Sequence, residues 1–541
     1  NLYHSLLSGQ RALVLLDNAA NLAQVKPLIP PAGCVLLVTS RQPIALPGME
    51  RIRLDELAPT EARELLLSLA ARITPELPEL MDQICYLCGY LPLAIRAAGS
   101  LLAVTEDLDV AEYTAQLKEE RTRLASIGEE GVEIGVEASF NLSYARLNEE
   151  AARVFRGLCV FPGSFDARAE EAICEDTGHK HLSELVKRSL VLFEPTEQRY
   201  RLHDLVRVFA ANRCSDTERP TYHQRHAEHF LIVLKEADRL YLQGGEAIRA
   251  GLALYDREWS NAQAAWAWIT EHTETIPRAL ELCSEYPNAS TYFAYLRQNP
   301  LEQIGWRETA LAAAQKLGRK DAQGVHLGNL GIAYESLGQP QRAIEFYEQV
   351  LAIARETGDR RGEGQSLNNL GLAYAELGEP RRAIEFCEQS LTIRREIGDR
   401  LGEGRTLNNL GIAYKNLGEP QRAIEFYEQA LPIRREIGDR RGEGATLGNL
   451  GIAYANLGEA RRAIEFYEQQ LAIAREIGDR RGEATALWNT AEMLKALGDR
   501  VQAITSAEAA LVIWEQIESP YAAMVREQLA EWRSEGGAAD E

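Results

Sequence analysis

The sequence has no apolar run of roughly 18 or more residues and no leader in which a charged stretch precedes an apolar one. We therefore expect neither a membrane span nor a secretory signal, and we assign the chain to the cytoplasm. Cysteine is scarce, with 8 in 541 residues, most of them in apolar helical contexts. This favours reduced core thiols over disulfides. The close pair Cys85 and Cys88 lacks the second pair that a zinc site needs, so we interpret it as core too.

Basic residues are outnumbered by acidic ones, 59 Lys and Arg against 80 Asp and Glu, which gives a formal net charge of −21. Phosphate backbones are bound by clustered basic surfaces, so this balance disfavours nucleic acid as a partner of this part of the protein. The composition, with 45% hydrophobic and 26% charged residues, is that of an ordinary globular protein. At about 100–200 residues per domain, a chain of 541 residues should contain several domains.

The C-terminal part of the chain repeats itself every 40 residues. The phrase NLGIAYESLGQPQRAIEFYEQ begins at Asn329, near copies follow, and the last copy is decayed. Within each copy, Gly331 and Tyr334 lie on one helix face, a Leu-Gly stop follows, and Ala343 and Tyr347 belong to the apolar stripe of a second helix. Each copy therefore predicts a helical hairpin, with the small residues where its helices approach closely.

This pattern resembles the tetratricopeptide repeat, with a second helix and loop lengthened by ETGDRRGEG at residues 356–364. The resemblance covers residues 301–520, including a degenerate unit before the first full copy. It implies an α-α superhelical solenoid whose first helices form a concave wall, the default surface for binding a protein or peptide. Residues 521–541 are assigned to a C-terminal cap and tail.

One polar residue recurs on the expected concave wall, next to the buried leucine face of the first helices. An amide carries donors and an acceptor, so a row of amides can hold the backbone of an extended peptide. The alternative is that each amide bonds within its own helix turn or to the adjacent hairpin. If the row binds a peptide, side chains that vary between copies, one turn along each first helix, would supply selectivity. The row is Asn329, Asn369, Asn409, Asn449 and Asn489, and the variable residues are Glu335, Ala375, Lys415, Ala455 and Lys495.

Residues 1–100 alternate strand and helix signals, which predicts a parallel α/β sheet. The segment RALVLLDN delivers Asp17 to the end of one strand, and CVLLVTSR delivers Thr39, Ser40 and Arg41 to the end of the next. Ligand chemistry in such sheets lies at the carboxyl ends of the strands. An aspartate and an arginine there suit a magnesium-bound polyphosphate. The alternative is that surface polar residues simply end two strands.

The order of these segments, followed by LDELAPTEARELL and by GYLPLA at residues 89–94, resembles the NB-ARC module of the STAND class of signalling ATPases. The resemblance implies that Asp17 is the Walker B residue that acts with magnesium, the one candidate catalytic residue. It also implies that Arg41 senses the terminal phosphate and that Pro92 packs near the adenine. ADP and ATP with magnesium are therefore the ligands expected of the full-length protein.

Residues 136–215 continue the resemblance as a winged-helix domain that ends in RLHD at residues 201–204. In the family a Met-His-Asp triplet contacts ADP through its histidine and locks a closed state, so the resemblance assigns this switch role to His203. Leu202 stands at the Met position. The alternative is a structural His203–Asp204 contact. A third interpretation is that this domain binds DNA. It is disfavoured because the last helix of the domain carries few arginines and lacks a basic flank.

Two departures limit the expected nucleotide chemistry. No G-x-x-x-x-G-K-[ST] loop occurs in the sequence, although that loop supplies the amides and lysine that hold the phosphates. Because the family places it upstream of Asp17 and the chain begins at Asn1 without Met, we interpret the chain as a fragment that starts after it. We expect this fragment to bind no nucleotide tightly and to lack catalysis alone. Asn18 replaces a second acid found in many relatives, which predicts slow ATP hydrolysis even in the full-length protein.

The prediction is a multidomain, mostly α protein. Its parts are a partial α/β nucleotide-binding domain at 1–70, a helical domain with GYLPLA at 71–135, the winged helix at 136–215, an α-helical connector at 216–300, the repeats at 301–520 and the tail at 521–541. The leading functional hypothesis is a nucleotide-switched regulator of signalling or transcription that binds a protein or peptide, with a homo-oligomer as the active state that the resemblance implies. The alternative is a protein-binding scaffold without nucleotide activity.

Overall fold

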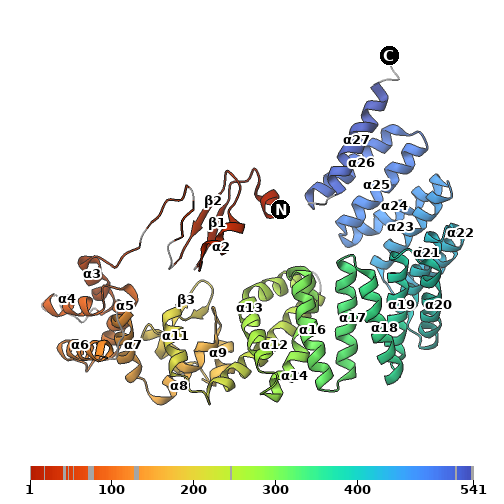
Figure 1. Cartoon of the computed structure of the whole chain (residues 1–541). Coiled ribbons are helices and arrows are strands. Elements are labelled where there is room, and N and C mark those ends of the chain that lie inside the picture. Colours follow the sequence, from red (N-terminus) through yellow and green to blue (C-terminus); the bar gives the residue numbers. More distant parts are fainter. Residues whose placement is uncertain are drawn as a thin grey trace. The chain divides into compact units, whose positions relative to one another are not determined.

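The computed structural model describes residues 2–17, 19–40, 44–46, 48–52, 54–70, 78–126, 133–243, 246–517, 519 and 521–537. It divides into two compact units, Asn1–Arg146 and Leu147–Glu541 (Figure 1). Helices make up most of both units, and the strands are short. The expected multidomain, mostly α fold is therefore confirmed.

The first unit begins with a small parallel sheet in which β1 (Leu13–Leu16) pairs with β2 (Val35–Val38). Around it lie α1 (Leu2–Leu7), α2 (Leu22–Val25) and η1 (Lys26–Leu28). One face of the sheet packs on a core of Ala19, Val25 and Ile44. The other face is open, with Leu13 67% exposed and Val35 63% exposed. Parallel sheets are normally covered on both faces, so this sheet has little packing to stabilise it.

Helices complete the first unit: α3 (Pro59–Leu69), α4 (Pro78–Leu87), α5 (Pro92–Val104), α6 (Val110–Ser126) and α7 (Glu133–Ala145). Helix α7 packs against α5 and α6. Its Gly135 approaches the end of α4 so closely that a Cβ there would lie 2.8 Å from the carbonyl oxygen of Leu87. This helix therefore packs with the preceding ones, and the first compact unit ends at Arg146.

The second unit opens with helices followed by a β-hairpin. The elements are α8 (Glu149–Gly157), η2 (Leu158–Val160), α9 (Ala167–Cys174), α10 (Lys180–Lys187), β3 (Leu192–Glu194), β4 (Arg199–Arg201) and α11 (Asp204–Arg213). Strands β3 and β4 are antiparallel, and a bridge joins Phe165 to Tyr200 beside them. This order is compatible with the expected winged helix.

An all-helical connector follows. It consists of α12 (Arg219–Gln243), α13 (Glu246–Glu271), α14 (Pro277–Glu285), η3 (Tyr286–Asn288) and α15 (Thr291–Arg297), and it leads into α16 (Pro300–Lys316). Two tryptophans of α13 are buried in its core, with Trp266 8% and Trp268 7% exposed. Trp306 of α16 stacks on Trp266 with ring centres 4.6 Å apart. One apolar core thus continues from the connector into the start of the solenoid.

Residues 320–516, all of them described, form five helical hairpins (Figure 1). Their first helices are α17 (Lys320–Ser336), α19 (Arg360–Glu376), α21 (Arg400–Asn416), α23 (Arg440–Asn456) and α25 (Arg480–Ala496). Their second helices are α18 (Pro340–Thr357), α20 (Pro380–Glu396), α22 (Pro420–Glu436), α24 (Ala460–Ile477) and α26 (Arg500–Gln516). Helix α16 precedes them in phase, and α27 (Tyr521–Gly537) packs on α26. The predicted solenoid is confirmed.

Small residues let the two helices of each hairpin approach. A Cβ at Gly331 of α17 would lie 2.3 Å from the ring of Tyr347 of α18, and Gly411 faces Tyr427 in the same way. Consecutive first helices also contact one another, α19 with α21, α21 with α23 and α23 with α25. In a superhelix the elements that stay closest from one repeat to the next lie on the concave side. The first helices therefore form the inner wall.

Candidate functional site

The structure places polar side chains together at the carboxyl edge of the small sheet. Asp17 follows β1 and Thr39 follows β2. The Thr39 hydroxyl donates a hydrogen bond to the Asp17 carboxylate. The Ser40 hydroxyl donates to a backbone carbonyl oxygen 2.6 Å away, which fixes the end of β2. Asp17 is exposed, so a ligand can reach it. Asn18 and Arg41 lie outside the described residues.

Pro92 is the first residue of α5 and is exposed. The turn before it places Gly89 and Tyr90 at φ values of 63° and 55°. The Tyr90 carbonyl accepts a hydrogen bond from the N–H of Leu57 at 3.1 Å, so this turn is tied to the segment that enters α3. The GYLPLA motif is thus a fixed turn that presents Pro92 at a helix start. Its contact with an adenine stays a prediction.

His203 is the N-cap of α11 and is exposed. Its Nδ1 accepts a hydrogen bond from the N–H of Leu205 at 3.2 Å, which places the proton of the neutral ring on Nε2. The hairpin before it is anchored by a buried ion pair, in which Arg199 Nη1 lies 2.6 Å from Glu258 Oε1 of α13. Arg199 Nε also donates to the hydroxyl of Ser164 at 2.8 Å. The connector therefore sets the position of the hairpin that leads to His203.

Asp17 and Pro92 belong to the first unit and His203 to the second. Each is described within its own unit, so their joint action on one nucleotide stays a prediction. Among the described residues, no group of three or more His, Cys, Asp and Glu side chains could hold a metal ion. Asp17 would supply a single carboxylate, which suits Mg²⁺ when phosphate oxygens and water complete its shell.

Cys85 and Cys88 of α4 are both buried. Burial raises the pKa of the Cys85 thiol to about 11 and that of Cys88 to about 12. Both groups therefore stay protonated at neutral pH, which makes them poor nucleophiles and poor metal ligands. The interpretation of this pair as core thiols is confirmed.

All five asparagines of the row are half-buried on the first helices. Two of them bond to the preceding hairpin: Asn409 Nδ2 donates to Asn368 Oδ1, and Asn449 Nδ2 donates to Asn408 Oδ1, each at 3.1 Å. This is the adjacent-hairpin contact of the alternative interpretation, present at two positions. Contact of the row with a peptide stays a prediction. The sequence analysis missed the accepting residues, although the residue before the row is asparagine in these copies and glycine in the first and fourth.

An apolar row lies one turn along from the asparagines on the same helices, and its members are at least partly exposed. It consists of Ile332, Leu372, Ile412 and Ile452. Near the end of α17, burial raises the pKa of Glu335 to about 7, while the Tyr347 hydroxyl donates to its carboxylate at 2.9 Å. The inner wall thus combines amide, apolar and ionisable groups, a surface suited to a peptide rather than to one small polar ligand.

The loops between hairpins hold an ion-pair network that the sequence analysis treated only as extra length. Arg360 pairs with Glu363 of its own helix at 2.6 Å and also with Glu396 at the end of the same hairpin. Arg400 repeats this with Glu403 at 2.7 Å, and so does Arg440 with Glu443 at 2.5 Å. These pairs tie the start of each first helix to the end of its second helix.

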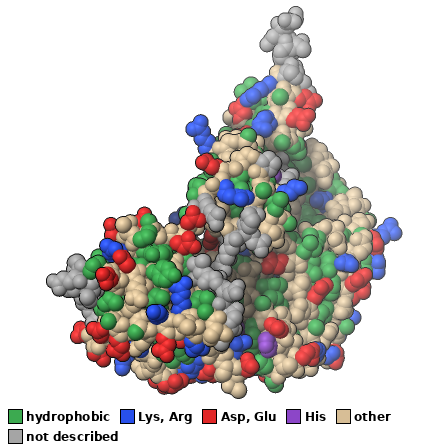
Figure 2. Space-filling view, turned by 60° about the vertical axis from the view of Figure 1, so that its left-hand side comes forward, with side chains coloured by type: hydrophobic (Ala, Val, Ile, Leu, Met, Phe, Trp, Pro, Cys, Tyr) green, Lys and Arg blue, Asp and Glu red, His purple; other side chains and the backbone are tan. Residues whose placement is uncertain are grey.

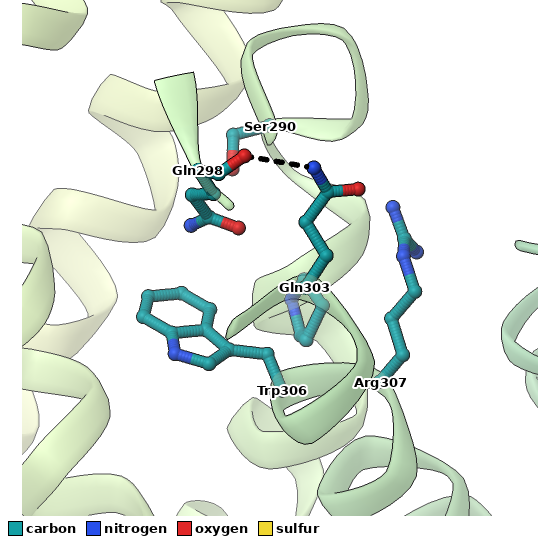
Figure 3. A pocket seen from close by; sticks show the side chains of 6 residues that line it. Ser290, Gln298, Gln303, Trp306 and Arg307 are labelled. Atoms are coloured by element: carbon teal, nitrogen blue, oxygen red, sulfur yellow. Dashed lines mark hydrogen bonds between the residues drawn. The ribbon is translucent and has the colours of Figure 1, made fainter. Parts of the chain in front are cut away.

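A small polar pocket lies where the connector meets α16, and Figure 3 shows its lining. Gln303 Nε2 donates to the backbone carbonyl of Gln298 at 3.1 Å, and Trp306 and Arg307 project from the next turn. Arg307 is 1% exposed. The sequence analysis did not single out these residues. They belong to the packing of the joint between connector and solenoid.

On the face shown in Figure 2, acidic and basic side chains are interspersed rather than segregated. This arrangement gives that face no concentrated basic surface of the kind that phosphate backbones require. None of the helices that the structure describes combines the length and the apolar character needed to cross a membrane.

Comparison with known proteins agrees with the repeats and the fold. Residues 289–356, 362–436 and 442–516 match the tetratricopeptide repeat family, so the solenoid is a tetratricopeptide array. The structure is similar to that of PH0952 from Pyrococcus horikoshii, a STAND protein with a tetratricopeptide repeat sensor. The TM-score is 0.50 and the identity 19%, over 97% of this chain and 78% of that one. This likeness shows a shared fold over nearly the whole chain.

The sequence relatives of this chain are named as regulators. The regulatory protein AfsR of Streptomyces coelicolor is 39% identical over 226 residues, 40% of this chain and 22% of AfsR. A putative HTH-type transcriptional regulator of Mycobacterium bovis is 28% identical over 331 residues, 56% of this chain and 36% of the regulator. The chain thus spans about a fifth to a third of the length of these relatives.

Proposed function

We propose that this chain is part of a signalling or transcriptional regulator and that its tetratricopeptide solenoid senses a protein or peptide on the inner wall. The observation that carries the proposal is the row of half-buried amides on the inner helices, beside an apolar row that starts at Ile332. Amides can bond the backbone of any extended peptide, and the apolar row can hold its side chains. Sequence relatives of the chain are named as regulators, which supports a regulatory function.

A peptide-selection experiment tests this part of the proposal. Peptides are selected from a displayed random library against the chain and then measured by calorimetry against two variants. Ile332→Arg places a charge on the inner wall, and Val512→Arg makes the same kind of change on a second helix, where Val512 is 52% exposed. We expect the first variant to weaken binding at least about tenfold, since a buried unpaired charge is costly. Equal binding by both variants would rule out the inner wall.

The second part of the proposal is that the regulator is switched by ADP and ATP. Asp17, with the Thr39 hydroxyl bonded to it, offers an exposed carboxylate at a strand end, where such sheets bind ligands. Bound Mg-nucleotide would supply the phosphate charge that distinguishes the two states. In this proposal Asp17 holds the metal, Arg41 meets the terminal phosphate, Pro92 borders the base and His203 contacts ADP. A scaffold without nucleotide is the competing function.

His203 offers a sharp test of the switch, because its imidazole both caps α11 and is the proposed ADP contact. In the full-length gene product, His203→Ala removes both roles. His203→Asn retains capping, since asparagine is a favourable N-cap, but lacks the imidazole. We expect both variants to copurify with less ADP than the wild type, measured by chromatography of the released nucleotide. Normal ADP content in the asparagine variant would assign His203 to capping alone, and a wild type without nucleotide would favour the scaffold.

A further inference from the structure

The junctions between hairpins are of two kinds, although the sequence repeats closely. At the two central junctions, α19 to α21 and α21 to α23, an asparagine in the earlier hairpin accepts hydrogen bonds from the later one. At the flanking junctions, α17 to α19 and α23 to α25, glycine stands at the accepting position. The repeats therefore differ in the polar contacts that join them.

At the first central junction Asn368 Oδ1 accepts from two donors, Asn409 Nδ2 and Thr406 Oγ1, both at 3.1 Å. At the next junction Asn408 Oδ1 accepts from Asn449 Nδ2 at 3.1 Å. The hydroxyl of Thr446 lies 3.3 Å from the same Oδ1, but its one proton also has the Gly442 carbonyl oxygen of its own helix at 3.0 Å, so the Asn408–Asn449 bond carries this junction. Both threonines are fully buried. Each set forms a polar strut between consecutive inner helices. To bind a ligand through the same Nδ2 hydrogen, Asn409 or Asn449 would have to give up a bond in a partly buried place.

At the flanking junctions the equivalent struts cannot form. Gly328 and Gly448 have no side chain to accept a bond, and Ser366 turns its hydroxyl to the carbonyl of Gly362 in its own helix at 2.8 Å. No hydrogen bond among the described residues engages the amide groups of Asn369 or Asn489, which stand across from the two glycines. These amides are half-buried on the inner wall yet uncommitted.

Two further observations concern the space and the hydrogen-bond acceptors at the flanking junctions. A Cβ at Gly328 would meet nothing within 4 Å, so there is room beside Asn369. At the other junction the Gln470 side chain reaches over Gly448, where a Cβ would lie 2.8 Å from its Oε1. That Oε1 is buried and has no hydrogen-bond partner among the described residues. A buried acceptor without a partner is costly, and a ligand donor would relieve it.

We propose that the asparagines of this row have two different roles. Asn409 and Asn449 are struts that hold the spacing of the central hairpins, whereas Asn369 and Asn489 bind the backbone of the ligand at two separated contact points. This proposal rests on peptide binding as the proposed function and specifies where on the wall it occurs. Helices in contact lie about 8–10 Å apart, which is about three residues of extended chain. Three repeats separate the two points, so the ligand is an extended peptide segment of roughly nine residues or more.

The stability arm of the test needs no ligand. Asparagine is changed to alanine at each of the four positions, which occupy the same helical register, so the gain in helix propensity is the same in each variant. We expect Asn409→Ala and Asn449→Ala to melt at least about 2 °C below Asn369→Ala and Asn489→Ala, because only the first two lose a strut. Four equal melting temperatures would overturn the assignment of struts.

The binding arm uses the selected peptide whose affinity Ile332→Arg weakens, at temperatures where every variant is folded. We expect Asn369→Ala with Asn489→Ala to weaken its binding about tenfold or more, and Asn409→Ala with Asn449→Ala to change it less than about twofold. Equal losses, or a larger loss in the central pair, would overturn the division. If no selected peptide responds to Ile332→Arg, the proposed function fails and with it the contact points, while the melting comparison still decides the struts.

The opposite change adds a hydrogen-bonded strut at the α17 to α19 junction, which lacks one. Gly328→Asn with Ser366→Thr reproduces the central set around Asn369, and the open space at Gly328 accommodates the new side chain. We expect a higher melting temperature together with weaker binding of the same peptide, since the Asn369 amide becomes committed. Gly328→Ala with Ser366→Thr is the control that adds no acceptor. Unchanged affinity in the strut variant, despite a raised melting temperature, would remove Asn369 from the contact points.

Discussion

Single glycines with opposite surroundings lie on one helix of the solenoid, α17. A Cβ at Gly331 would lie 2.3 Å from the Tyr347 ring, whereas one at Gly324 would meet nothing within 4 Å. We expect Gly331→Ala to lower the free energy of unfolding by about 1–3 kcal/mol through overpacking. Gly324→Ala should raise it by about 0.5–1 kcal/mol, because alanine favours the helix. Urea denaturation of the two variants checks the signs, and a shared sign would show that the ring moves aside.

A buried histidine predicts how the second unit responds to acid. His226 of α12 is 1% exposed and lies between Phe161 and Phe230. Burial lowers its pKa to about 3, against about 6.5 in an unfolded chain. As pH falls below about 6.5, the unfolded chain takes up a proton that the folded chain refuses. The contribution of His226 to stability is therefore fully present above about pH 6.5 and is lost progressively toward about pH 3.

The variant His226→Leu isolates this contribution. Between about pH 6.5 and pH 5, one such histidine should cost up to about 1.4 kcal/mol of stability per pH unit, and the variant should lack that part of the slope. Urea denaturation at several pH values measures both slopes. Parallel slopes for wild type and His226→Leu would show that the ring is charged in the folded protein.

Among the elements, the small sheet and the hairpins differ most in packing. Strands β1 and β2 cover only a small core and expose one apolar face, whereas the first four hairpins share one continuous core. A pair of strands with so little cover is marginal, and local opening is easiest where few apolar contacts hold an element. We expect amide hydrogens of both strands to exchange well before those of α19 to α23 in a mass-spectrometric experiment. Comparable protection would mean that the exposed face is covered in solution.

The repeated hairpins also show how close sequence copies acquire different roles. Asn369 and Asn409 occupy the same position in successive copies, yet only Asn409 finds an asparagine across the junction. The difference comes from Gly328 and Asn368, each 41 residues upstream of its partner position. A contact between repeats depends on two copies at once, so an element that looks equivalent in its own repeat is not equivalent in the array.

For the whole molecule, the sharpest expectation concerns nucleotide. The chain contains no phosphate-binding loop of the G-x-x-x-x-G-K-[ST] kind, so it lacks the amides and lysine that supply most phosphate contacts. A ligand raises the melting temperature only by binding the folded state. We therefore expect no rise with millimolar Mg-ATP, measured by scanning calorimetry, with Mg-free ATP as the control for ionic effects. A clear rise would show that Asp17 and its neighbours bind nucleotide without the loop.

The positions of several candidate site residues could be predicted from the sequence, because they depend only on neighbouring residues in the chain. Asp17 and Thr39 end two apolar runs, so the sequence predicted that both lie at strand ends of a parallel sheet, whereas their hydrogen bond was not predicted. Pro92 at a helix start is equally local. The packing of α7 with the preceding helices could not be predicted, because it depends on the close approach at Gly135, which leaves no periodic pattern in the sequence.

The sequence by itself determined the hairpins, their period and the inner position of the asparagine row, because helix periodicity and repetition are properties of neighbouring residues. Only the tertiary structure decided which members of that row are committed to their neighbours. Asn409 and Asn449 are engaged, while Asn369 and Asn489 are not, although all four occupy the same register position of their first helices. The physical reason is that a hydrogen bond needs both partners within about 3 Å, and the superhelix alone brings residues of successive hairpins that close.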